Sequence, residues 1–251
     1  MICVWKSSVQ CLKILKAIQH TNKMVNFNFD ANGIHVMSMD MSKTSLVRLE
    51  LESSEFEKYE CDSNLTLGLY TEVLVNVLQK AKKNKVIWQS SSEGLQMKIT
   101  FVDNEQKTEF ALRTIDIDDD QLAIPELNDD MALRIPRDII KDWMDKMLMT
   151  NEDVEFNITP QTFTCQTDST ELGMITHTEP IGTDRIQAIA TRNDVHAKFS
   201  SYATKSISIF ALTGGDTCIL GFSNQQPSRI KVLLGDDSYI CLYIAPKIID
   251  D

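Results

Sequence analysis

The chain of 251 residues lacks the long apolar runs that place a protein in a membrane. No stretch approaches the roughly 18 consecutive apolar residues that a membrane-spanning helix needs. The apolar stretch Ile2–Trp5 is too short for the core of a signal peptide, and no basic residue precedes it. We therefore expect an intracellular protein with no membrane partner.

Close cysteine pairs are also missing. Six cysteines are scattered along the chain without a CxxC pair: Cys3, Cys11, Cys61, Cys165, Cys218 and Cys241. A zinc site needs ligands in close pairs, so this spacing argues against one. In a reducing compartment, scattered cysteines are typical of small buried side chains.

Motifs for catalysis are absent as well. The sequence has no GxGxxG, GxxxxGK[ST] or GxSxG motif, and its four histidines are far apart. In the acidic middle of the chain, Asp116, Asp118 and Asp120 match the first three ligands of a calcium loop. Gln121 and Leu127 stand where that loop requires glycine and glutamate. We expect no enzyme, no cofactor and no metal; a metal-dependent nuclease that uses these aspartates is the alternative from the enzyme class.

The charge is strongly acidic but unevenly distributed. With 25 basic and 36 acidic residues the net charge is −11, which at first argues against a nucleic-acid binder. Residues 1–29 and 73–92, however, each contain four lysines and no acid, so the other 202 residues carry −19. Both blocks coincide with helical patterns. We therefore predict a basic stripe on an acidic body, suited to holding a polyanion through its phosphates.

Strand patterns dominate the sequence. Val25, Phe27 and Phe29 alternate with polar residues, and Asn32-Gly33 then provides a hairpin turn. Another alternating segment, 206–212, is also predicted to be a strand. Helical periodicity is confined to four segments: 9–20, 72–83, 137–148 and 192–204.

The order of these elements indicates an α+β protein of two similar domains. We predict an N-terminal domain at 1–113 and a C-terminal domain at 132–251. The segment 114–131 between them contains six aspartates, one glutamate and Pro125, which suits an exposed extended connector.

Three stretches have the sequence, order and spacing of one known family. The first is GIHVMSMD at 33–40, followed by SLVRL at 45–49. The second is DxDxxQLxIP at 116–125, and the third is YIAPKI at 243–248, just before the terminal acids. Together they resemble the proliferating cell nuclear antigen (PCNA) family of DNA sliding clamps. The second half matches mainly by length, element order and tail, which suits a divergent member such as a viral one.

The resemblance implies a DNA clamp fold and a ring. Each domain would have antiparallel sheets on the outside and two helices on the inner face, and three protomers would close head to tail. Basic residues near the helices would then face duplex DNA without reading its sequence. The positions implied are Lys13, Lys16, Lys80, Lys83, Arg137, Lys141, Lys198 and Lys205.

Two further sites follow from the same resemblance. The subunit interface would pair two edge strands, with Phe110, Ala111, Leu112 and Arg113 on one side and Gly173, Met174, Ile175 and Thr176 on the other. A pocket beneath the connector would bind a short partner motif. Its implied residues are Met39, Leu46, Leu122, Ile124, Pro125, Pro227, Tyr243, Ala245 and Pro246.

The function implied is that of a processivity factor without catalytic activity. A homotrimer would encircle double-stranded DNA and tether DNA polymerase, flap nuclease, ligase and clamp loader through that motif. The expected location is the nucleus, or a cytoplasmic replication site for a viral protein. One subunit of a heterotrimeric clamp, or a monomeric clamp-like processivity factor, is the alternative.

Overall fold

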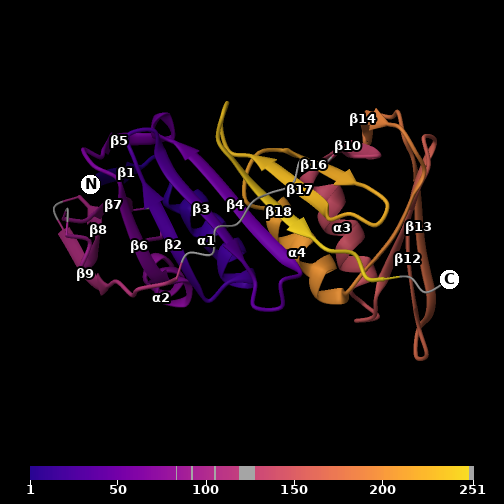
Figure 1. The fold of residues 1–251 in the computed structure, drawn as a ribbon, viewed down its shortest axis with the longest axis horizontal. Coiled ribbons are helices and arrows are strands. Elements are labelled where there is room, and N and C mark those ends of the chain that lie inside the picture. The colour runs from indigo at the N-terminus through magenta and orange to yellow at the C-terminus, as the bar shows by residue number, and fades with distance from the viewer. Residues whose placement is uncertain (83, 92, 105, 119–127, 249–251) are drawn as a thin grey trace. The chain divides into compact units, whose positions relative to one another are not determined.

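The computed structural model describes residues 1–82, 84–91, 93–104, 106–118 and 128–248 (Figure 1). These residues form two compact units. Unit 1 comprises Met1–Met41, Leu46–Leu122 and Leu234–Ile240, and unit 2 comprises Ser42–Ser45, Ala123–Leu233 and Cys241–Asp251. Within the described residues, no helix is long and apolar enough to cross a membrane.

In its described part, the N-terminal half of the chain has nine strands and two α-helices, together with a short 3-10 helix at Ser53–Glu55. In chain order they are β1 (Ile2–Trp5), α1 (Ser8–Thr21), β2 (Met24–Phe29), β3 (Gly33–Met39), β4 (Ser45–Glu52), β5 (Phe56–Glu60), β6 (Leu65–Tyr70), α2 (Thr71–Leu78), β7 (Lys85–Gln89), β8 (Gln96–Asp103) and β9 (Gln106–Arg113). They form an antiparallel sheet ordered β5-β1-β7-β8-β9 and a second run ordered β4-β3-β2-β6.

The C-terminal half repeats this element order in its described part. Its elements are β10 (Met131–Pro136), α3 (Arg137–Met147), β11 (Val154–Ile158), β12 (Thr162–Ser169), β13 (Gly173–Pro180), β14 (Gln187–Thr191), β15 (Val195–Phe199), α4 (Ser201–Ala211), β16 (Thr217–Phe222), β17 (Ser228–Leu233) and β18 (Tyr239–Ile244). One sheet is ordered β13-β12-β11-β15, and β14-β10-β16-β17 are neighbours in another. The predicted α+β class with antiparallel sheets is confirmed.

The helix α1 has an apolar stripe along its length and a capping residue at its start. Cys11, Ile14 and Ile18 recur at helical spacing and are fully buried. The hydroxyl of Ser7 accepts a hydrogen bond from the backbone N–H of Gln10 at 3.2 Å, which satisfies one of the free donors at the helix start. The predicted helix at 9–20 is confirmed to within one residue at each end.

The prediction for the fourth helix is wrong. The segment 192–204 contains the strand β15, in which Val195, Ala197 and Phe199 alternate inward with polar neighbours. The segment 206–212, predicted to be a strand, lies almost entirely in α4. Its alternation of serine and isoleucine imitates a strand, yet Ser200 caps a helix by accepting a hydrogen bond from the N–H of Ala203 at 3.2 Å.

Each unit has an aromatic core of its own. In unit 1, the ring of Trp5 packs edge-on against Phe56 and Trp88 at 5.0 and 5.2 Å. In unit 2, Trp143 stacks on Phe163 at 5.0 Å. Five of the six cysteines are buried as predicted, and Cys61 is half-buried.

Gly33 in the first family motif has a steric role. A Cβ atom at this position would lie 1.9 Å from the carbonyl oxygen of Leu51 on β4. Only glycine allows the two backbones to approach this closely at the start of β3.

His35 links the strands β3 and β4 through charge. Its Nδ1 is hydrogen-bonded to Glu50, and its Nε2 lies 3.2 Å from Oδ1 of Asp30. Both ring nitrogens face carboxylates, so both need a proton. Burial lowers the pKa of His35, but the hydrogen bonds to Glu50 and Asp30 outweigh burial and raise the pKa above its usual value.

The raised pKa predicts a pH-dependent contribution of His35 to stability. We expect the free energy of unfolding of the wild type, relative to His35→Gln, to be largest below about pH 6.5, the usual pKa of histidine. This advantage should decline as the pH rises through the raised pKa of the folded state, because the imidazolium loses its proton. Urea unfolding of both proteins at a series of pH values from below 6.5 to above the raised pKa tests this pH dependence. The control is His196→Gln, at an exposed histidine. An advantage that stays constant with pH would contradict the ion pairs.

Candidate nucleic-acid interface and partner pocket

The helices of unit 1 expose two lysines between buried apolar residues. Lys13 and Lys16 lie one turn apart on the exposed face of α1. The helices α1 and α2 pack against each other, and the hydroxyl of Ser8 at the start of α1 donates to the carbonyl of Lys82 just beyond α2 at 2.9 Å. The start of α1 and the segment just after α2 are therefore neighbours in unit 1.

The helix α2 is shorter than predicted. It ends at Leu78, so Lys80 lies in the turn that follows and is exposed. Lys83 lies outside the described residues.

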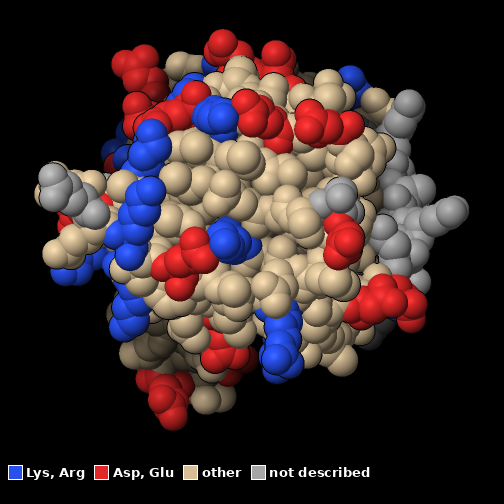
Figure 2. Space-filling model, turned by 90° about the vertical axis from the view of Figure 1, so that its left-hand side faces the viewer, with Lys and Arg blue, Asp and Glu red and all other residues tan. Residues whose placement is uncertain are grey.

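Figure 2 shows one face of the molecule on which basic side chains gather in a column along one margin, while the centre of the face is largely uncharged.

The third helix places acids beside its basic residues. Lys141 is ion-paired with Asp145, and Nζ of Lys146 lies 2.6 Å from Asp142. The hydrogen bond to Asp145 raises the pKa of Lys141. Arg137 donates to the carbonyl of Gly214 at 2.9 Å. The predicted positions on α3 are thus engaged within the unit.

Lys205 and Lys198 differ in position. Lys205 is exposed on α4. Lys198 lies on the strand β15 rather than on a helix, and its ammonium is 3.2 Å from Glu155 on the neighbouring strand β11. The helical face that led to the prediction for Lys198 therefore does not exist.

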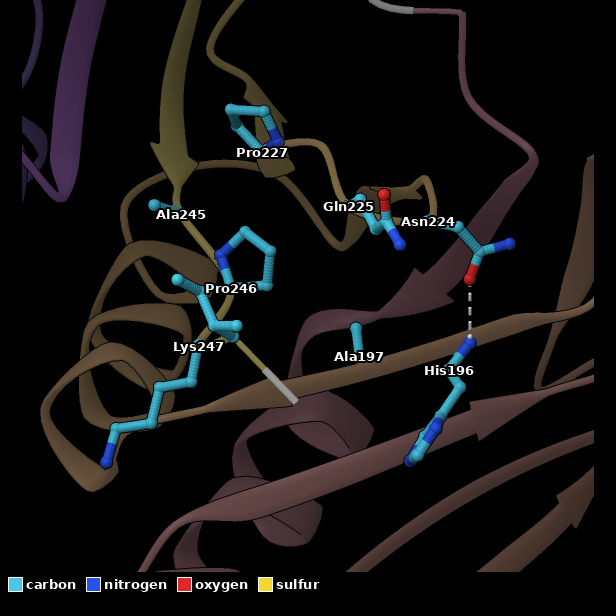
Figure 3. Close-up of a pocket in the computed structure, with 9 residues that line it drawn as sticks. His196, Ala197, Asn224, Gln225, Pro227, Ala245, Pro246 and Lys247 are labelled. Atoms are coloured by element: carbon cyan, nitrogen blue, oxygen red, sulfur yellow. Dashed lines mark hydrogen bonds between the residues drawn. The ribbon is translucent and has the colours of Figure 1, made fainter. Parts of the chain in front are cut away.

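A pocket of about 690 Å³ lies in unit 2 beside the C-terminal segment. It brings together three of the predicted positions, Pro227, Ala245 and Pro246 (Figure 3). Sequence reasoning missed the rest of its lining: His196, Ala197, Asn224, Gln225, Lys247 and Ile248. No sequence signal pointed to the first two, because the strand that carries them was predicted to be a helix.

The C-terminal segment is held against unit 2 by its backbone and by one ion pair. The N–H of Lys247 donates to the carbonyl of Lys198 at 2.7 Å, and its ammonium lies 2.7 Å from both carboxylate oxygens of Asp153. The N–H of Ala245 donates to Thr44 at 2.8 Å. This anchoring keeps small apolar side chains at the surface as a preformed lining.

The other predicted pocket positions lie elsewhere in the described structure or outside it. Met39 is exposed at the end of β3, Leu46 is buried in β4, and Tyr243 is half-buried in β18. The remaining three lie outside the described residues: Leu122, Ile124 and Pro125.

Both segments predicted to form the subunit interface are edge strands. Phe110, Ala111, Leu112 and Arg113 lie in β9, the last strand of the five-stranded sheet. Gly173, Met174, Ile175 and Thr176 lie in β13, the last strand of the four-stranded sheet. Phe110 is half-buried against Phe101 at 5.3 Å, whereas Met174 is 64% exposed. Each edge leaves backbone hydrogen-bonding groups available to another strand.

The acids that end the predicted connector have a structural role. Asp129 is buried, with its carboxylate 3.1 Å from Nε of Arg229, so the prediction of an exposed residue is wrong here. Asp130 accepts from the side chain of Asn193 at 2.7 Å. Asp116 and Asp118 are exposed, and Asp120 lies outside the described residues. Among the described side chains, no three His, Cys, Asp or Glu converge as a metal site.

Comparison with known proteins agrees with this architecture. The family model "Proliferating cell nuclear antigen, N-terminal domain" matches residues 5–122. A proliferating cell nuclear antigen from Chaetomium thermophilum is 28% identical over 248 residues, covering 95% of both chains. The N-terminal half of the chain therefore matches the PCNA family, and a named member of that family is similar over nearly the whole length.

Two further PCNA-family relatives extend the similarity along the chain. The DNA polymerase sliding clamp 1 of Thermococcus kodakarensis is 24% identical over 227 residues, covering 88% of both chains. A crystal structure of the antigen from Entamoeba histolytica has the same fold, with a TM-score of 0.89, 21% identity and 98% of both chains covered. The PCNA fold therefore extends over both halves, including the second half, which the motifs matched less well.

Proposed function

We propose that this chain is a DNA sliding clamp of the PCNA family that acts as a processivity factor for DNA polymerase. The observation that carries the proposal is similarity over nearly the whole length to proteins named as this antigen and as a polymerase sliding clamp. The exposed lysines of α1 support it, because a clamp needs sequence-independent attraction to phosphates.

The proposed role is that of a scaffold without catalysis, at a nuclear or a cytoplasmic replication site. A nuclease would need carboxylates that hold metal ions between them. Among the aspartates of the predicted connector, Asp129 instead forms a buried ion pair with Arg229 that stabilises the fold. Cleavage of DNA that requires magnesium and is lost in Asp118→Ala would favour the nuclease.

The proposed assembly is a homotrimer that pairs β9 of one protomer with β13 of the next. Two different open edges on one chain form a head-to-tail contact, and such a contact closes into a ring when its rotation fits. Met174 supports this assignment, because a large apolar side chain at an open edge is typical of an interface.

We expect a stable species of three chains in solution, which Met174→Asp converts to monomer. A charge buried in the interface should weaken association by at least about tenfold. Sedimentation over a range of concentrations measures the change. Met149→Asp is the matched control, since Met149 is equally exposed at 66% but lies outside both edge strands. A wild type that stays monomeric would favour the monomeric factor, and trimers formed only with other clamp subunits would favour the heterotrimer.

We expect Lys13→Glu with Lys16→Glu to lower clamp-dependent DNA synthesis by about tenfold or more, because each lost phosphate contact weakens the hold on DNA. Primer extension at moderate salt measures the effect. Lys43→Glu with Lys58→Glu makes the same charge change at exposed lysines away from the helices. Full synthesis by the α1 variant would contradict the proposed DNA-facing role of this helix.

The pocket beside the C-terminal segment is the proposed site for partner peptides. Polymerase, flap nuclease, ligase and clamp loader would each insert a short motif with aromatic and aliphatic anchors. The small apolar lining at Pro227, Ala245 and Pro246 suits such anchors.

We expect Ala245→Arg to weaken binding of such a peptide by at least about tenfold, or 1.4 kcal/mol, because the new side chain fills the pocket. Anisotropy of a labelled peptide with two aromatic anchors measures the affinity. Gln226→Arg adds the same side chain next to the pocket but outside its lining. Equal affinity of the two variants would contradict the assignment.

A further inference from the structure

The two helix pairs carry the same net charge in different arrangements. The helices α1 and α2 contain two lysines and one glutamate, whereas α3 and α4 contain four basic residues and three aspartates. Both pairs therefore have a surplus of one positive charge. With equal net charge on the helices, the pairing of the charges becomes one source of difference in their attraction for a polyanion.

The lysines of α1 have no acidic neighbour on their own helix. The sequence of α1 contains no Asp or Glu, and in the part of the chain that the structure describes neither Lys13 nor Lys16 forms an ion pair. Their ammonium groups are exposed and available to phosphates.

The lysines of α3 are paired one helical turn away. Lys141 binds Asp145, and Lys146 binds Asp142, both at the (i, i+4) spacing that brings side chains together. The second carboxylate oxygen of Asp145 accepts from the hydroxyl of Ser208 on α4 at 3.2 Å. This hydrogen bond between helices holds the carboxylate beside Lys141.

We propose that Asp142 and Asp145 compete with DNA phosphates for Lys146 and Lys141, which makes α3 a weakly attractive segment of the DNA-facing surface. The inference rests on the proposed function, in which both helix pairs face the duplex. An exposed ion pair is weak and easily opened, so the pair itself does not prevent contact. The aspartate that remains repels the phosphate, and this repulsion offsets the attraction of the lysine.

The consequence is an uneven hold on the duplex. The α1 surface attracts phosphates and the α3 surface is nearly neutral toward them. A clamp that encloses DNA does not need tight binding, and weaker phosphate contacts favour movement along the duplex.

The test replaces both aspartates by their neutral isosteres. We expect Asp142→Asn with Asp145→Asn to bind a short fluorescein-labelled duplex several-fold more tightly at low salt. The slope of log K against log salt concentration should steepen by up to about 2, since each phosphate contact contributes about 0.9. Asparagine can still accept the hydrogen bond from Ser208, so the fold should be retained, and an unchanged melting temperature and trimer mass verify this.

Matched variants separate the possible outcomes. Asp184→Asn with Asp194→Asn makes the same change in net charge at exposed positions of unit 2 away from the helices. An equal gain in both double variants, or no gain in either, overturns the inference. Lys13→Gln with Lys16→Gln tests the proposed function separately: loss of binding there supports the DNA-facing surface even when the α3 variant shows no gain.

Discussion

Burial of one apolar stripe on each helix is the constraint on which the rest of the structure depends. Cys11, Ile14 and Ile18 are packed into the core. Helical spacing then places Lys13 and Lys16 on the exposed face of α1. The same geometry in α3 buries Ile140 and Trp143 and leaves its aspartates and lysines outside together. The surface offered to a partner is therefore fixed by the packing of the core.

Net charge is a poor guide to such a surface. A chain of −11 repels a polyanion on average, but local attraction depends on which charges lie within a Debye length of the phosphates, about 10 Å at moderate salt. The acids at the end of the connector show that the net charge of the whole chain does not describe the charge at its surface. Asp129 is buried against Arg229 and stabilises the fold, so it adds little to the field outside.

The parts of the fold predicted from sequence are those in which local pattern and final packing agree. The hairpin at Asn32-Gly33 and the helices α1 and α3 were found because their periodicity is unambiguous. The helix α4 was missed because alternating serine and isoleucine satisfy a strand pattern as well, and only packing decides between them. The pocket could be predicted only in part, because it joins β15, the turn before β17 and the C-terminal segment, which are far apart in sequence.

The repeated element order explains how one chain can carry two different surfaces. The helices α1 and α3 each follow the first strand of their half of the chain, and α2 and α4 each follow the sixth. In element order, α3 therefore corresponds to α1, and α4 corresponds to α2. Core packing restricts only the buried stripe of each helix, so the exposed positions of the two units can diverge without cost to the fold. In α1 those positions hold lysines without acids, whereas in α3 they hold lysines paired with aspartates. The two helices therefore keep a buried apolar stripe in common and differ in how their exposed charges are paired.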